Sequence, residues 1–153
     1  MSGGVVGLDD LRRLLASGHG LTAVTTVRPD GTVSATLVNV GVLAHPVSGE
    51  DVVGFVVRGD AVKLRRFRRQ RHTTAIAHVA WEWVAVSGPL DMAGPDDRLD
   101  GLDPGTLPAL LRAVYRAAGG SHDDWDTFDR VMAEERRAAV LVRPERVGGN
   151  LRS

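Results

Sequence analysis

The sequence contains no cysteine. Disulfide bridges, thiolate nucleophiles and thiolate metal sites are therefore excluded. No apolar run approaches the roughly 18 residues that a membrane-spanning helix requires. The first ten residues also lack the charged segment and long apolar run of a signal peptide. We therefore expect no membrane association and a cytoplasmic protein.

An excess of charge is also missing. The 153 residues include 19 basic and 19 acidic side chains, so no overall field favours a polyanion such as nucleic acid. The length suits one domain with a real core. We expect a single domain over residues 1–153, in which 1–7 and 147–153 are loose tails.

Motifs for hydrolases and nucleotide triphosphatases are absent, since no GxSxG, HExxH or P-loop spacing occurs. The histidines show no known metal-ligand spacing, and we interpret all of them as structural or exposed: His19, His45, His72, His78 and His122. We predict no metal site and assign no catalytic side chain. If the protein is an enzyme, a cofactor supplies the difficult chemistry.

The hydrophobic pattern predicts helices over 8–17, 61–71, 107–118 and 125–136, and six strands over 21–28, 32–43, 52–57, 73–80, 82–92 and 138–143. The turn Pro29–Gly31 joins the first two strands as a hairpin. Because neighbouring hairpins imply antiparallel pairing, we expect an α+β fold built on a six-stranded barrel.

Two strands carry unusual residues. Asn39 is a polar side chain within an apolar strand, and Gly41 would let another backbone or a ligand come close. Gly88 and Pro89 are expected to interrupt their strand with a bulge or bend.

A basic helix follows the turn at Arg58–Asp60. Its segment holds six basic residues and no acid: Lys63, Arg65, Arg66, Arg68, Arg69 and Arg71. We predict Asp60 as the N-cap, with free amides and a positive dipole end behind it that attract anions. Lys63 and Arg66 lie three residues apart, so both can reach one phosphate, and Arg58 can join them.

Three interpretations of this helix remain open. It can be a solvated basic face, a nucleic-acid contact or the binding site of a phosphate-bearing cofactor. Nucleic acid is disfavoured because Phe67 is the sole aromatic in the segment and is needed for packing. The charge is local, which suits a small anionic ligand better than a long polyanion.

Trp81 and Trp83 are two residues apart and are therefore expected on the same face of an extended segment. Tryptophans on strands usually belong to a core or a subunit interface. Stacking beside a flat cofactor is the functional alternative. The two interpretations agree if the site lies at an interface.

Four segments of the chain resemble one family in their order and spacing: 23–43, 55–78 (FVVRGDAVKLRRFRRQRHTTAIAH), 81–97 and 123–147. The chain resembles the split β-barrel flavin and deazaflavin oxidoreductases related to pyridoxamine 5′-phosphate oxidase. The closer branch uses the deazaflavin coenzyme F-420. The resemblance implies a six-stranded antiparallel split β-barrel with flanking helices, and a homodimer with cofactor sites at the interface.

The resemblance also implies roles for individual residues. Lys63 takes the position of the lysine that binds cofactor phosphate, with Arg58 and Arg66 as its assistants. The ring of the cofactor is expected to lie against three residues of the second strand, Thr36, Val38 and Asn39. The implied interface also provides a position for Trp81 and Trp83.

The implied activity is an F-420-dependent reductase that transfers hydride to an electron-poor organic substrate. Ala61 and Val62 stand where FMN-binding relatives commonly carry Ser or Thr, which favours the deazaflavin over FMN. An acidic oligoglutamate tail, as on F-420, would suit the basic segment 65–71. The alternatives are an FMN-dependent oxidase of the same fold and a non-catalytic dimer that binds flavin or haem.

Overall fold

The computed structural model describes residues 5–18 and 20–152. One antiparallel sheet runs in the order β2-β1-β5-β6-β7-β4-β3, and β8 pairs with β6 beside this path. The strands are β1 Leu21–Val27, β2 Val33–Asn39, β3 Gly41–Ala44, β4 Asp51–Val57, β5 His72–Val79, β6 Glu82–Ala93, β7 Ala138–Val142 and β8 Arg146–Asn150. The helices are α1 Leu8–Ser17, α2 Val62–Arg69, η1 Pro104–Thr106 (a 3-10 turn), α3 Leu107–Ala117 and α4 Trp125–Glu134.

The α+β class and the antiparallel pairing are confirmed, whereas the expected number of six strands is wrong for the described residues. The segment 32–43 divides into β2 and β3 at Val40. The segment 147–153, expected to be a loose tail, contains most of β8. Its residues 147–150 are ordered because they hydrogen-bond along β6, where Val147 pairs with Val86, and because Val147 packs on the core together with Leu151.

The junction between β2 and β3 is held from two sides. Val40 is fully buried, and its N–H donates to the carbonyl of Gly20 at 2.9 Å. A Cβ on Gly41 would lie 2.1 Å from the carbonyl carbon of Ala117. The expectation that Gly41 admits another backbone is therefore confirmed, and that backbone is the C-terminal end of α3.

The long strand β6 exchanges partners along its length. Residues 82–89 pair with β5, and residues 90–93 pair with β7. The strand continues through Gly88 and Pro89, so the expected interruption is wrong. The change of partner strand occurs at Gly88 and Pro89, because the backbone of Arg143 crosses close to Gly88. A Cβ on Gly88 would lie 1.7 Å from the carbonyl oxygen of Arg143.

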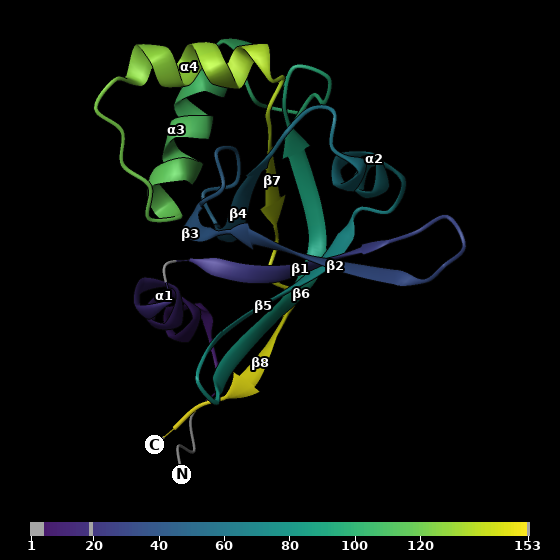
Figure 1. Cartoon of the computed structure of the whole chain (residues 1–153), viewed down its shortest axis with the longest axis vertical. Helices are drawn as coiled ribbons and strands as arrows, with labels where there is room; N and C mark the ends of the chain where they lie inside the picture. Colours follow the sequence, from purple (N-terminus) through teal and green to yellow (C-terminus); the bar gives the residue numbers. More distant parts are fainter. Residues whose placement is uncertain (1–4, 19, 153) are drawn as a thin grey trace.

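Two apolar clusters flank the sheet. Helices α1 and α2 insert side chains into the first cluster, where the rings of Phe55 and Phe67 lie 6.0 Å apart. Helices α3 and α4 form the second cluster with β7, centred on Leu111, Val114 and Phe128. Figure 1 shows α3 and α4 together at one end of the molecule and α2 on the other side of β4 and β7. None of the described helices is long and apolar enough to cross a membrane.

The contact at Gly41 generates a stability prediction. Gly41→Ala places a methyl group against the backbone of α3, and overpacking of this kind costs about 1–3 kcal/mol of unfolding free energy. Gly148→Ala is the matched control, because a Cβ there meets nothing within 4 Å. Urea unfolding should show a large loss for Gly41→Ala and a change within about 0.5 kcal/mol for Gly148→Ala. Equal stability of the two variants would contradict this packing.

Candidate functional site

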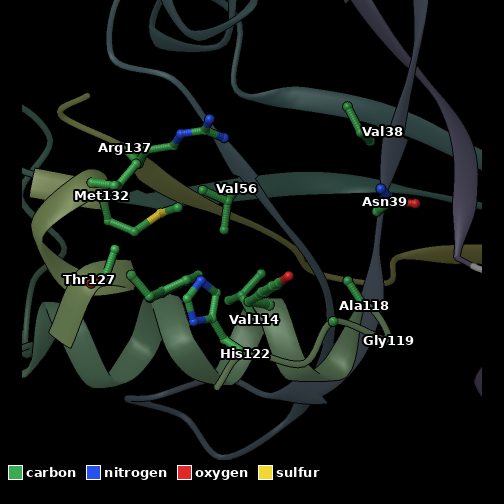
Figure 2. A pocket seen from close by; sticks show the side chains of 14 residues that line it. Val38, Asn39, Val56, Val114, Ala118, Gly119, His122, Thr127, Met132 and Arg137 are labelled. Atoms are coloured by element: carbon green, nitrogen blue, oxygen red, sulfur yellow. The ribbon is translucent and has the colours of Figure 1, made fainter. Parts of the chain in front are cut away.

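A cleft of about 590 Å³ opens between the C-terminal ends of β2 and β4 and the helices α3 and α4 (Figure 2). Its walls are mainly apolar and come from Val38, Val56, Val114, Phe128, Val131 and Met132. Polar side chains of Asn39, Tyr115, His122, Thr127 and Arg137 also line it. Apolar walls with a few placed polar groups are typical of small-molecule sites.

The turn between α3 and α4 shapes one side of the cleft. Gly119 adopts a φ of +91°, which favours glycine, and Gly120 lies flat against the ring of Tyr115. Asp124 then caps α4 by accepting a hydrogen bond from the N–H of Thr127 at 3.1 Å. Phe128 and the cap are thereby fixed beside the cleft.

His122 belongs to this turn and lines the cleft. Its Nδ1 accepts a hydrogen bond from the backbone N–H of Asp124 at 3.0 Å. The ring packs against Trp125 and Phe128, with centroids 5.8 and 5.7 Å away. The sequence led us to interpret His122 as structural or exposed and did not indicate that it lines the cleft.

Glu135 connects the cleft with the turn that precedes α2. One carboxylate oxygen accepts hydrogen bonds from Nε and Nη2 of Arg137 at 3.0 and 2.9 Å. The other oxygen lies 3.8 Å from Nη1 of Arg58. The carbonyl of Glu135 also accepts the N–H of Gly59 at 3.1 Å. Arg137, on the wall of the cleft, is thus held to the strand end that leads into α2.

Helix α2 begins without a side-chain cap. Its N-cap is Ala61, and Asp60 instead lies 3.4 Å from Nε of Arg58, so the prediction of Asp60 as the cap is wrong. The helix starts one residue later than expected, at Val62, which leaves Asp60 outside capping position. Its first turn contains no acid. The N–H of Leu64 donates to the carbonyl of Ala61 at 3.2 Å, so the amides of Val62 and Lys63 are the ones available to an anion.

Lys63 is the second residue of α2 and is half-buried. Burial lowers the pKa of its ammonium group from the ordinary value of 10.5. Within residues 5–18 and 20–152, it forms no ion pair with a carboxylate. A partly desolvated cation without a counter-ion is a candidate for binding an anionic ligand.

The arginines of the basic helix differ in their contacts. Arg66 donates to Thr26 Oγ1 at 3.2 Å, and Arg69 donates to the carbonyl of Val27 at 2.6 Å. Arg68 forms two hydrogen bonds of 2.7 Å with the buried Asp97, which raise the pKa of Arg68. These three side chains fasten α2 to its neighbours. Exposed Arg65 and Arg71 form no such contact among the described residues.

The predicted ring-binding residues fall into separate places. Val38 and Asn39 line the cleft, whereas Thr36 is exposed on β2 and outside the lining. Trp83 lies on β6, but Trp81 lies in the β5–β6 turn and is 79% exposed. The expectation that both tryptophans share one face of a strand is wrong, because Ala80 turns the chain with a φ of +51°.

One face of the sheet carries apolar side chains toward the solvent. By strand register the following residues share it, and we call it the outer sheet face: Leu21, Ala23, Val33, Leu37, Asn39, Ile76 and Trp83. Leu37 is 64% exposed and Val33 is 60% exposed. A patch of this kind usually marks an interaction surface. Asn39 belongs both to this face and to the cleft lining, so the cleft opens at its border.

No protein-family model matches the sequence. A pyridoxamine 5′-phosphate oxidase-related, FMN-binding protein of Nostoc punctiforme superposes with a TM-score of 0.64 at 15% identity, over 93% of this chain and 80% of that one. An F-420 reductase gives 0.57 at 17% identity, over 84% and 88%. A haem-binding protein of Mycobacterium smegmatis gives 0.62 at 16% identity, over 96% of this chain and 55% of that longer one.

Identities this low establish the fold alone. The chain has the fold of the pyridoxamine 5′-phosphate oxidase-like proteins, among which an F-420 reductase also occurs, so the resemblance is confirmed at the level of the fold. Within the described ranges, no group of three or more His, Asp or Glu side chains is arranged to hold a metal ion.

The lowered pKa of Lys63 generates a pH prediction. Below its folded-state pKa, the charged ammonium is less favourable in the folded than in the unfolded chain, so Lys63→Met should raise the unfolding free energy at pH 7 slightly. This gain should fade as pH rises toward 10.5, where the unfolded lysine also loses its proton. Arg65→Met, on the exposed face of α2, is the control and should show no such trend. A clear loss of stability for Lys63→Met at pH 7 in urea unfolding would reveal a native partner.

Proposed function

We propose that the chain is a flavin-type oxidoreductase that binds the deazaflavin F-420 and transfers hydride to an electron-poor organic substrate. The observation that carries the proposal is the uncapped start of α2 with half-buried Lys63, which Arg58, Glu135 and Arg137 connect to an apolar cleft. A cleft of about 590 Å³ is of a size that ligand pockets typically have. The donor set therefore fits a flat ring joined to a phosphate.

In this proposal the chain divides the binding of the cofactor between two regions. Lys63 and the first-turn amides of α2 hold the phosphate, and Arg58 contributes charge at the adjoining strand end. Arg66 has a smaller part than the resemblance implies, because Thr26 already engages its guanidinium group. Val38, Asn39 and Val56 face the ring from the two strands that border the cleft.

The reduced deazaflavin, when bound, supplies a hydride from its C5 atom. The protein contributes orientation, exclusion of water and electrostatics. The valine and phenylalanine walls displace water, while His122, Asn39 and Arg137 offer hydrogen-bond donors to a ligand. No side chain is required as an essential acid or base in this scheme.

The preference for F-420 over FMN rests on sequence and charge. Ala61 offers no hydroxyl at the start of α2, as it is the N-cap without a side-chain hydrogen bond. Arg65 and Arg71 are exposed without ion pairs among the described residues, so both suit an acidic tail. FMN is the second candidate, because the fold is shared with an FMN-binding protein. Binding of flavin or haem without catalysis is the alternative from another class.

We further propose that two copies of the chain associate through the outer sheet face. Leu37 and Ile76 lie on either side of Ala23, on the two strands that flank β1, and Leu21 is two residues from Ala23 along β1. Leu21, Leu37 and Ile76 are 51%, 64% and 38% exposed. A second copy would remove this apolar surface from water. Because Asn39 lies where this face meets the cleft, association would place each cofactor site at the interface.

Titration of the purified protein with F-420 and with FMN tests the cofactor assignment. We expect tighter binding of F-420, and Lys63→Ala should weaken it at least about tenfold, equivalent to about 1.4 kcal/mol, because a charge-assisted hydrogen bond to phosphate is lost. Arg69→Ala, whose side chain binds the Val27 carbonyl, is the control on the same helix. Tight FMN binding without F-420 affinity would overturn the cofactor assignment, and unchanged affinity in Lys63→Ala would remove Lys63 from the phosphate site.

Light scattering after gel filtration tests the association. Leu37→Asp puts a charge on the outer sheet face, at its most exposed leucine, and should convert the dimer to a monomer at micromolar concentration. Val47→Asp changes an apolar side chain that is 47% exposed but lies in the β3–β4 loop, and should leave the dimer intact. A wild-type chain that is monomeric at high concentration would refute the proposal.

A further inference from the structure

We propose that His122 is the residue that positions the substrate, through a hydrogen bond from its Nε2–H to an acceptor oxygen on an apolar ring compound. The inference deepens the proposed function, since the ligand is the substrate that would meet the cofactor in the cleft. It gives the turn between α3 and α4 a role in binding the substrate, and this role does not follow from the fold.

The first step of the argument is the tautomer of His122. Its Nδ1 lies 3.0 Å from the backbone nitrogen of Asp124, which carries a hydrogen and can only donate. Nδ1 must therefore accept and bear no proton. Asp123 Oδ1 lies 3.9 Å from the same nitrogen, too far for a competing hydrogen bond. In the neutral ring the proton then resides on Nε2, which becomes a donor.

The second step is the rigidity of the donor. The ring of His122 packs against Trp125 and Phe128, and the amide that orients it belongs to Asp124, the N-cap of α4. Figure 2 shows the imidazole among the cleft side chains, beside Thr127 and Val114. A donor held by both packing and a capped helix start is fixed before a ligand arrives, which reduces the entropy lost on binding.

The third step concerns the other polar groups of the cleft. Thr127 Oγ1 is engaged with Asp124 at 2.6 Å, and the hydroxyl of Tyr115 donates to the carbonyl of Ser121 at 3.3 Å. Arg137 uses Nε and Nη2 on Glu135. The described lining includes no carboxylate. The cleft therefore presents donors from His122, Asn39 and Arg137, and among them His122 is the one held by the aromatic packing of α4.

These features define the class of ligand. A donor-rich cleft without carboxylates selects against amines and other cations, and favours carbonyl, quinone or nitro oxygens. Val56, Phe128 and Met132 provide apolar contact for a flat ring, and the flexible thioether of Met132 can adapt to different outlines. The structure thus points to a planar, uncharged ring with at least one acceptor oxygen that bonds to His122.

The test uses 1,4-naphthoquinone as the probe and naphthalene, which lacks the oxygens, as its matched control. The absence of cysteine prevents thiol addition to the quinone. In wild-type protein labelled with 15N-histidine, saturating naphthoquinone should shift the Nε2 resonance of His122 and leave its unprotonated Nδ1 signal in place. His122→Phe, which keeps an aromatic ring in the packing, should weaken naphthoquinone binding about fivefold and leave naphthalene binding unchanged.

His78→Phe, a histidine of β5 outside the cleft lining, is the control variant and should bind naphthoquinone as the wild type does. The proposal is overturned if naphthoquinone fails to bind, if the Nε2 resonance does not move, or if His122→Phe weakens naphthalene equally. The same titration in cofactor-free Lys63→Ala separates the two proposals. A retained Nε2 shift there supports the role of His122 even if F-420 binding is refuted, whereas a lost shift overturns it.

Discussion

The close approach of α3 to the junction of β2 and β3 is the constraint on which the site depends. Gly41 allows the backbone of Ala117 to lie where any other residue would place a side chain. Because α3 is pressed there, its last turn and the following Gly119 border the end of β2, and α4 returns over the second apolar cluster. The cleft is the space left between these helices and the sheet.

Electrostatic contacts join this cleft to the start of α2. Glu135 binds Arg137 with one oxygen and lies near Arg58 with the other, so the wall of the cleft and the end of β4 are held together. On the far side of α2, Arg68 is fixed by Asp97. Three of the six basic side chains of this segment, Arg66, Arg68 and Arg69, are therefore anchored. Lys63 is half-buried and forms neither an ion pair nor a side-chain hydrogen bond with the residues that the structure describes. That contrast is what directs the phosphate proposal to Lys63.

The alternating strands, the hairpin turns and the antiparallel α+β class are predictable from the sequence, because local pattern and turn chemistry agree there. β8 escaped prediction since its Gly148 and Gly149 have little strand propensity, and pairing with β6 forms it. The position of Trp81 was predicted wrongly because no local sequence motif indicates the positive φ of Ala80. His122 lines the cleft because α3 and α4 pack together. The spacing of residues along the chain does not reveal this packing.

The central claim is that the cofactor phosphate binds at the start of α2 while its ring enters the cleft. A crystal structure of the protein with F-420 bound tests this most directly. The account predicts the phosphate beside Lys63 and the first-turn amides of α2, with the deazaflavin ring against Val38, Asn39 and Val56. A phosphate bound elsewhere, such as among the arginines Arg71, Arg98 and Arg143 that line a separate cleft, would contradict it.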